Sequence, residues 1–209
     1  KEAKKLAIKY FGNKKNSGIP FSQKIKYKSK KKITKIVRVN TNQNQLMLGF
    51  VTGVSFKNKD RYSLRVIADI LSMGVSSRIF NRLVYDMGIA YSVGAGNWSF
   101  SDSGLFYING GFSTQNIEKA ITVILEELNN LKKNEVGKKE LKDAKNRDKA
   151  QFYFLLEAPD SLANLYATQL ITEKKITTPE EIFRQIDLVS SEEIKNGACK
   201  YFTKENLSL

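Results

Sequence analysis

The sequence has no histidine and only one cysteine, Cys199, among its 209 residues. Without histidine the chain cannot build a histidine-containing zinc site, a Ser-His-Asp triad or a Cys-His pair. One cysteine excludes an internal disulfide, and its neighbours Ala198 and Tyr201 predict a buried helix position, where free cysteine packs as a small apolar side chain. Acidic pairs such as Glu126-Glu127 lie on predicted helices, where we expect exposed or first-turn carboxylates. The chain alone therefore lacks the side chains of the common hydrolytic centres.

Long apolar runs are also missing. No stretch of about eighteen apolar residues occurs, and the first residues lack the charged-then-apolar pattern of a signal peptide, so the sequence predicts no membrane span. Hydrophobic residues make up 41% of the chain, which suffices for the core of one sizeable domain. The chain opens on Lys1 without an initiator methionine and stops on Leu209 in an apolar segment, which we interpret as a fragment. The compartment stays open between bacterial periplasm and cytoplasm.

Positive charge is concentrated in one segment. The net charge is +14, and residues 1–39 contribute thirteen lysines and Arg38 against the single acid Glu2. Clustered lysines can release counterions from phosphate groups, so a nucleic-acid contact through residues 24–38 is one interpretation. No aromatic platform or arginine cluster accompanies these lysines, and Lys, Asn and Ile are abundant throughout the chain. We therefore favour a solvated linker and surface strands, with no nucleic-acid partner.

The N-terminal part divides into a helix and a linker. Residues 2–11 show helical spacing and Gly12 fits the helix stop. Residues 13–32 are polar, rich in lysine and interrupted by glycine and proline. We predict residues 1–12 to be the last helix of a preceding domain, residues 13–32 a linker, and residues 33–209 a C-terminal domain. The helix residues expected to face inward are Ala3, Leu6, Ala7, Tyr10 and Phe11.

The remaining elements predict an α+β fold, with a mainly antiparallel sheet and helices packed on one face. Strands are predicted where β-branched and aromatic residues gather between turn residues, over 33–39, 45–51, 89–100 and 104–112. Residues 101–104 have the turn chemistry of an antiparallel hairpin. Apolar residues at helical spacing predict helices from Asp60, Ser76, Thr114, Val136, Ser161, Thr178 and Ser190 onward, the last reaching Tyr201.

The most informative stretch is residues 74–93, which contain Ser76-Ser77-Arg78-Ile79-Phe80, then an arginine-containing helix end, then Gly88-Ile89-Ala90-Tyr91-Ser92-Val93. This order resembles the most recognisable segment in the C-terminal domain of pitrilysin/insulinase-type zinc metallopeptidases, which include the processing peptidases. Residues 103–108, 117–131 and 140–145 continue the match, so the resemblance runs from about Gln43 to the end of the chain. It implies the pitrilysin-type domain fold and makes residues 33–209 the C-terminal domain without zinc.

The resemblance also implies a division of labour between two homologous domains around a peptide substrate. In the family the N-terminal domain holds zinc, where metal-activated water attacks the peptide carbonyl. We therefore expect no cofactor in this chain and zinc in an N-terminal domain or partner subunit. The family's second domain contributes an arginine and a tyrosine that help to stabilise the oxyanion.

These two family residues are only partly present. Tyr91 matches the tyrosine and is the main substrate-binding candidate. Val84 stands where the arginine is expected, seven positions earlier, and an apolar side chain cannot supply a charged donor. Arg82 lies nearby and is the secondary candidate, while Arg78 belongs to the Ser-Ser-Arg element, for which we expect a structural role. No catalytic residue and no metal ligand is predicted in this chain.

Two functions are therefore weighed. The first is the non-zinc half of a zinc-dependent endopeptidase, which closes the chamber and contacts extended peptide but is inactive alone. The second is a degenerate, non-catalytic binding or assembly subunit of a peptidase heterodimer, which Val84 favours. Two aromatic groups receive structural interpretations: Trp98 with Phe100 could line a peptide surface but is more often half-buried, and residues 152–154 on a helix are expected to pack in the core.

Overall fold

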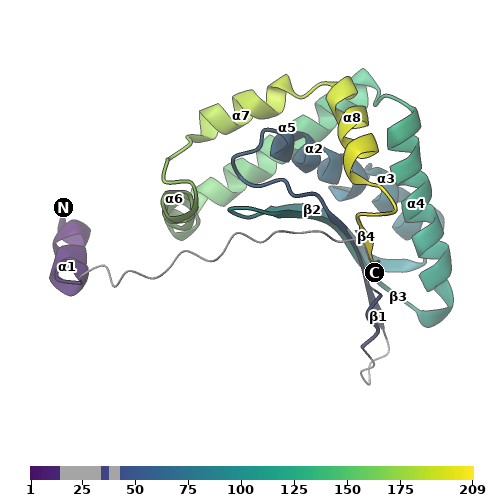
Figure 1. Cartoon of the computed structure of the whole chain (residues 1–209), viewed down its shortest axis with the longest axis horizontal. Helices are drawn as coiled ribbons and strands as arrows, with labels where there is room; N and C mark the ends of the chain where they lie inside the picture. The colour runs from purple at the N-terminus through teal and green to yellow at the C-terminus, as the bar shows by residue number, and fades with distance from the viewer. Residues whose placement is uncertain (15–33, 38–42) are drawn as a thin grey trace.

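The structure, a computed structural model, describes residues 1–14, 34–37 and 43–209. It confirms the α+β fold, with a four-stranded antiparallel sheet in the order β2-β3-β1-β4 (Figure 1). The strands are β1 (Asn44–Val51), β2 (Ala90–Ser99), β3 (Gly104–Phe112) and β4 (Leu207–Ser208). The predicted hairpin is formed by β2 and β3, whose register runs from Ala90 opposite Phe112 to Ser99 opposite Gly104.

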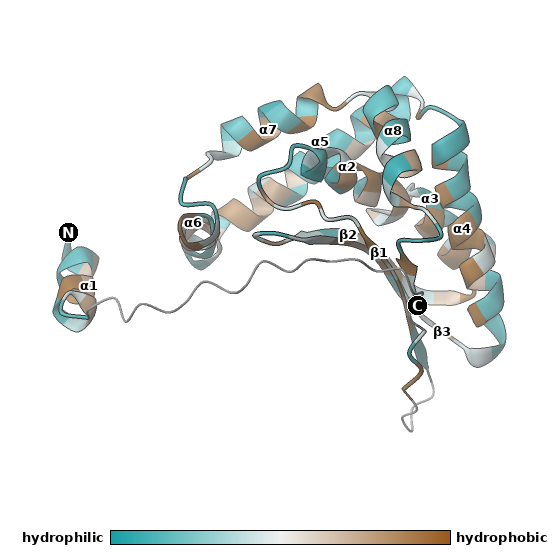
Figure 2. Ribbon diagram, viewed as in Figure 1, coloured by the Kyte–Doolittle hydropathy of each residue, from teal (hydrophilic) through white to brown (hydrophobic). Residues whose placement is uncertain are grey.

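Helices α2 to α8 lie on one side of this sheet, and α1 is drawn apart from them (Figure 1). Figure 2 shows apolar and polar residues alternating along these helices, as in amphipathic helices that cover a core. A six-residue π-turn, η1 (Asn81–Asp86), follows α3, and a short 3-10 turn, η2 (Thr114–Asn116), precedes α4. The helices are α1 (Glu2–Phe11), α2 (Asp60–Ser72), α3 (Arg78–Phe80), α4 (Ile117–Lys133), α5 (Lys138–Glu157), α6 (Pro159–Thr172), α7 (Pro179–Leu188) and α8 (Ser191–Tyr201).

The core lies between the sheet and the helices. On β1 and β3 every second side chain points into it, and Phe50 and Phe106 are almost fully buried. Both rings pack on Phe202 after α8, at centroid distances of 5.1 and 4.8 Å. From the helical side the fully buried side chains include Leu64, Ile67, Leu71, Ile79, Leu83 and Leu131. Each such side chain contributes about 1.5–3 kcal/mol through burial, so the core fixes both the sheet and the helix layer.

The other face of the sheet carries no helix from the part of the chain that the structure describes, and we call it the open face. Ladder pairing arranges its side chains in four rows across β1, β3 and β2. The rows are Gln45, Gly111 and Ser92; Met47, Asn109 and Gly94; Gly49, Tyr107 and Gly96; and Val51, Leu105 and Trp98.

Several predictions for the N-terminal part change or stay open. Residues 34–37, in the middle of the strand predicted over 33–39, belong to no regular element, and the rest of that strand lies outside the described residues. Most of the predicted linker and of the lysine segment 24–38 also lies outside them. Helix α1 forms where predicted, but none of its residues is buried, and Leu6, Tyr10 and Phe11 are 49%, 64% and 66% exposed. The apolar side of α1 therefore has no core within the described chain.

Other corrections concern single side chains. Cys199 is exposed rather than buried, because α8 turns Ala198 and Tyr201 into the core and leaves the next position outward. Of the aromatic run on α5 only Phe152 is buried, whereas Tyr153 and Phe154 are exposed. Strand β4 was not predicted, because two residues carry no alternation signal.

Candidate functional site

Two glycines bracket the segment that carries the candidate residues. Gly74 and Gly88 adopt φ values of +80° and +60°, a left-handed conformation that side-chain-bearing residues rarely adopt. Gly74 ends the loop after α2, and its carbonyl accepts a hydrogen bond of 2.7 Å from the Ser77 hydroxyl. Ser77 is 1% exposed, so this contact fixes the entry into α3 inside the protein. Between the two glycines the predicted single helix is divided into α3 and η1.

The π-turn η1 carries Arg82 and Val84. A π-turn adds a residue to the helical turn and is frequent at functional sites. Val84 is half-buried and packs against the core. Val84 therefore contributes packing, and position 84 lacks the charged hydrogen-bond donor that the resemblance led us to expect there.

Arg82 is held by two acids of α4. Its guanidinium donates to Glu127 Oε1 at 2.6 Å and to Glu126 Oε2 at 2.8 Å. Hydrogen bonds to these carboxylates, Glu126 foremost, raise the pKa of Arg82 above its ordinary value. Glu127 is 7% exposed, so the prediction that this acidic pair is exposed is wrong for Glu127: it is the buried partner of Arg82.

Arg78 forms the adjoining ion pair. It contacts Glu140 of α5 in bidentate fashion, with Nε–Oε1 and Nη2–Oε2 distances of 2.6 and 2.8 Å. Its Nη1 also lies 4.0 Å from Glu127 Oε2. The hydrogen bonds to Glu140 raise the pKa of Arg78 despite its partial burial. Arg78 thus joins α3 to α4 and α5, which is the contact set of a structural residue.

Tyr91 occupies a β-bulge on the edge strand β2. The pairing of β2 with β3 skips from Ala90 opposite Phe112 to Ser92 opposite Gly111, so Tyr91 has no residue opposite it. Its side chain is 67% exposed. Bulges re-aim a side chain and are common beside functional sites. The strand signal predicted Tyr91 in β2, but the bulge depends on the register with β3 and has no local signal.

A buried ionic cluster beneath this segment was not predicted. Asp69 of α2 and Asp148 of α5 are 4% and 3% exposed, and Arg65 donates to Asp148 Oδ1 at 2.7 Å. Burial first, and the negative charge of the neighbouring Asp148 second, raise the pKa of Asp69 to about 8. Arg147 follows on the next position of α5 and donates to the Ser76 hydroxyl at 3.4 Å. The only sequence signal was Arg65 and Asp69 within the otherwise apolar residues 64–71.

Within the described residues, one carboxylate oxygen of Asp69 and one of Asp148 are buried without a hydrogen-bond partner. Two carboxylates in contact satisfy these oxygens when one carries a proton and donates to the other. The Arg65 guanidinium donates to Asp148, which favours the proton on Asp69. Asp69 is then the protonated member, which agrees with the direction of its pKa shift.

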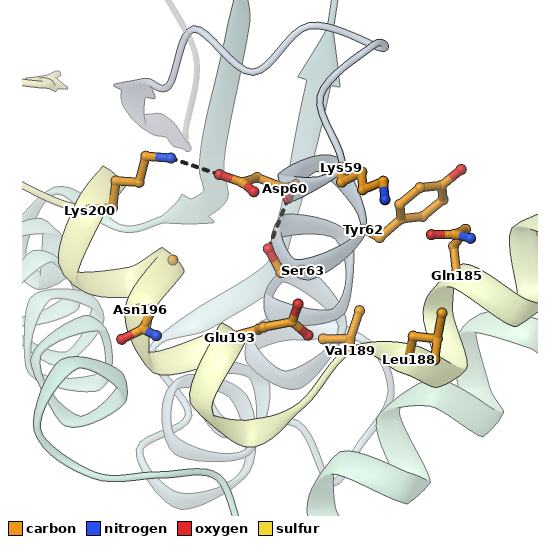
Figure 3. A pocket seen from close by; sticks show the side chains of 11 residues that line it. Lys59, Asp60, Tyr62, Ser63, Gln185, Leu188, Val189, Glu193, Asn196 and Lys200 are labelled. Atoms are coloured by element: carbon orange, nitrogen blue, oxygen red, sulfur yellow. Dashed lines mark hydrogen bonds and ion pairs between the residues drawn. The ribbon is translucent and has the colours of Figure 1, made fainter.

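A polar pocket of about 390 Å³ lies between the start of α2, α7 and α8 (Figure 3). Lys200 donates to Asp60 Oδ2 at 2.8 Å, and the Tyr201 hydroxyl donates to the same oxygen. These two hydrogen bonds, that of Lys200 first, lower the pKa of Asp60. Asp60 was predicted to cap α2, but its carboxylate instead joins the start of α2 to the end of α8. Asp60 and Lys200 are thus paired across two helices, which is a structural arrangement.

A larger pocket of about 530 Å³ lies where the end of β2 meets α2, α5 and α6. Its walls are mostly apolar and aromatic, with Phe100, Phe152 and Leu165 among them. Of the charged residues in it, Arg61 and Glu173 are paired with each other at 3.0 Å, and Arg65 is paired with Asp148. This pocket was not predicted and contains none of the candidate residues.

The residues present do not fit a zinc ion. The sequence has no histidine, and no group of three metal-binding side chains occurs within residues 1–14, 34–37 and 43–209. Over the same residues no helix is long and apolar enough to cross a membrane. The fold and site therefore define an α+β domain whose described part offers no metal centre.

Comparison with known proteins identifies the family. Residues 1–147 match the family described as the peptidase M16 inactive domain. The chain belongs to this family. The resemblance read from residues 74–93 is thereby confirmed.

Relatives and solved structures agree with this assignment. An uncharacterized zinc protease of Bacillus subtilis, YmxG, is 30% identical over 165 residues, which cover 79% of this chain and 40% of that protein. Subunit beta of the Saccharomyces cerevisiae mitochondrial-processing peptidase is 29% identical over 98 residues, or 46% of this chain and 21% of the subunit. A protease from Helicobacter pylori superposes with a TM-score of 0.83 at 24% identity, over 99% of this chain and 51% of that chain. This chain thus spans about 40% of the length of the first curated relatives.

Proposed function

We propose that this chain is the non-zinc half of a zinc-dependent endopeptidase, which contacts extended peptide and completes a chamber with a zinc-bearing domain. That domain would lie upstream in the same polypeptide or on a partner subunit. The observation that carries the proposal is Tyr91, an exposed tyrosine on a bulge of the edge strand, in a chain of the M16 inactive-domain family. The exposed apolar side of α1 supports a further domain next to residue 1.

The proposed chemistry for Tyr91 is hydrogen-bond donation. Zinc in the other domain would supply the activated water. The phenolic hydroxyl of Tyr91 would donate to the carbonyl oxygen of the substrate as negative charge develops on it. The ring needs no rearrangement to reach out of the sheet, because the bulge already leaves it exposed.

The experiment is reconstitution of proteolysis with the zinc-bearing half. We expect this chain alone to be inactive and Tyr91→Phe to lower kcat of the assembled enzyme by about a hundredfold, since one oxyanion donor is worth that much. Tyr153→Phe is the matched control, because Tyr153 is similarly exposed on α5 and packs on Phe183. Equal rates for Tyr91→Phe and wild type would contradict the role of Tyr91.

The second candidate is a degenerate binding or assembly subunit, and a specific observation favours it. Val84 packs against the core where the family has an arginine. Under this alternative the assembled complex binds peptide without cleaving it, or cleaves it at a rate that Tyr91→Phe leaves unchanged. The reconstitution therefore separates the two functions.

A further inference from the structure

The four rows of the open face, formed by β1, β3 and β2, contain no charged side chain. These rows contain glycine, neutral polar residues and apolar residues, although 27% of the chain is charged and the net charge is +14. A solvated sheet face normally carries charged residues, whereas the core of a binding surface is depleted in them. The composition of this face is therefore that of a contact surface.

Glycines make this face flat. The Tyr107 hydroxyl lies 2.5 Å from the place that a Cβ on Gly96 would take, so the Tyr107 ring lies across Gly96. In the same way Leu105 Cδ1 lies 3.3 Å from the Cβ position of Gly49. Side chains at these glycines would lift their neighbours away from the sheet. The side chains instead lie down on the backbone and form a smooth platform.

One end of the platform is aromatic. Trp98, the only tryptophan of the chain, packs on Tyr107 with ring centroids 4.5 Å apart and ring planes inclined by 40°, and it remains 46% exposed. Leu105 and Val51 complete the same row, and we call Trp98, Tyr107, Leu105 and Val51 the apolar end. The opposite end, with Gln45 and Ser92, is polar and adjoins Tyr91.

We propose that the apolar end is a peptide-binding subsite that takes a large apolar side chain of an extended substrate, about seven residues away from the bond held at Tyr91. The distance follows from the strand: seven residues separate Tyr91 from Trp98, or about 23 Å at about 3.3 Å per residue. An extended peptide that follows β2 covers this distance with the same number of residues. The position of the cleaved bond rests on the proposed function; the binding of an apolar peptide to this face does not.

Three features identify an extended peptide as the occupant. Within the described residues β2 is the outer strand of the sheet. The Ala95 N–H on its outer edge already donates to Ser72 Oγ at 2.6 Å, so an added strand would pair with β2 on either side of this position. The uncharged face penalises charged side chains, which would lose water without gaining a partner. The aromatic end offers a stacking surface to one bulky residue, and the flat glycine rows admit a backbone at close approach.

Trp98 itself reports binding. We would titrate the chain with a neutral peptide of about twelve residues, enough to span the platform, that carries one phenylalanine, and with a matched peptide carrying lysine instead. The phenylalanine peptide should shift Trp98 emission to the blue and saturate, at an affinity about tenfold higher than that of the lysine peptide. Equal affinities, or no change in emission with either peptide, would overturn the proposal.

Two charge variants test the location. Leu105→Lys places a charge in the apolar end, whereas Asn109→Lys places the same charge further along the same strand on the same face. Leu105→Lys should weaken the phenylalanine peptide about tenfold more than Asn109→Lys does. Val51→Lys, in the same row as Leu105, takes its place if Leu105→Lys unfolds. Equal weakening by the variant in the apolar end and by Asn109→Lys refutes the subsite.

The last experiment measures substrate preference with the assembled enzyme. Moving the phenylalanine along the substrate should give the highest kcat/KM when it lies about seven residues from the cleaved bond, in one of the two directions. A flat profile overturns the stated distance. If adding the zinc-bearing half changes Trp98 emission but adding either peptide does not, the face is a domain interface and the proposal is wrong. Failure of Tyr91→Phe to affect proteolysis would reject the proposed function and leave the emission assay intact.

Discussion

Replacing Asp69 with asparagine should change how stability depends on pH. Asparagine has nearly the shape of a protonated aspartic acid, so its amide can donate to Asp148 while the charge at position 69 is removed. The pKa of Asp69 is raised from 3.8 to about 8, chiefly by burial. The folded state therefore holds a proton that the unfolded state releases above about pH 4.

The sign of the effect follows from this proton. Since the folded state binds more protons, the free energy of unfolding of the wild type falls as pH rises between about 4 and 8. One proton corresponds to about 1.4 kcal/mol per pH unit, so the loss between about pH 5.5 and 7.5 is at most roughly 3 kcal/mol. Asp69→Asn should lose this slope and be more stable than wild type at the upper end.

The chain is well suited to the measurement. It has no histidine, so no imidazole titrates in this window and obscures the slope. Urea unfolding followed by circular dichroism at three pH values gives the free energy of unfolding. Asp143→Asn on α5 removes an equal charge from an exposed position and should keep the wild-type slope. Parallel slopes in wild type and Asp69→Asn would refute the protonated Asp69.

Three further outcomes are expected. Arg78→Ala should lower the free energy of unfolding by about 2 kcal/mol, because Glu140 loses a bidentate partner, and Arg78→Lys should restore only part of it in the same urea assay. Thr178→Ala should cost about 1 kcal/mol by removing the capping box with Glu181 at the start of α7, measured by thermal unfolding against the exposed Thr122→Ala. Val84→Arg should raise kcat/KM of the reconstituted peptidase at least about tenfold if the charged donor at position 84 is all that the protein lacks. Val84→Met, the uncharged control, should give no such gain. No gain with Val84→Arg would argue that the parent protein is degenerate.

Local signals in the sequence predicted the elements well. Residues 101–104 set the β2–β3 hairpin because turn chemistry acts within a few residues. Thr178 and Glu181 form the predicted helix start with both hydrogen bonds of a capping box. The prediction that Cys199 is buried was wrong because a helix turns by about 100° per residue, so a buried residue and an exposed one can be direct neighbours.

Contacts between segments far apart in the chain could not be predicted from the sequence. The bulge at Tyr91 depends on its register with β3, and the pairing of Arg82 with Glu127 joins residues 45 positions apart. Asp69 and Asp148 come together only because α2 packs on α5. Such pairs have no periodicity of their own, so sequence can supply the residue types but not which of them meet.

The ion pairs of Arg82 bear on how the parent enzyme would work without the family arginine. For Arg82 to reach a substrate, its guanidinium would have to leave Glu126 and Glu127. Glu126 is exposed and can be solvated, but Glu127 is 7% exposed and would keep only Arg78, at 4.0 Å. Removing one partner of a buried pair is costly, because the remaining charge stays uncompensated. Use of Arg82 in place of the missing arginine would thus break the contacts that hold η1 to α4. The Val84→Arg variant is therefore the more direct test of activity in the parent protein.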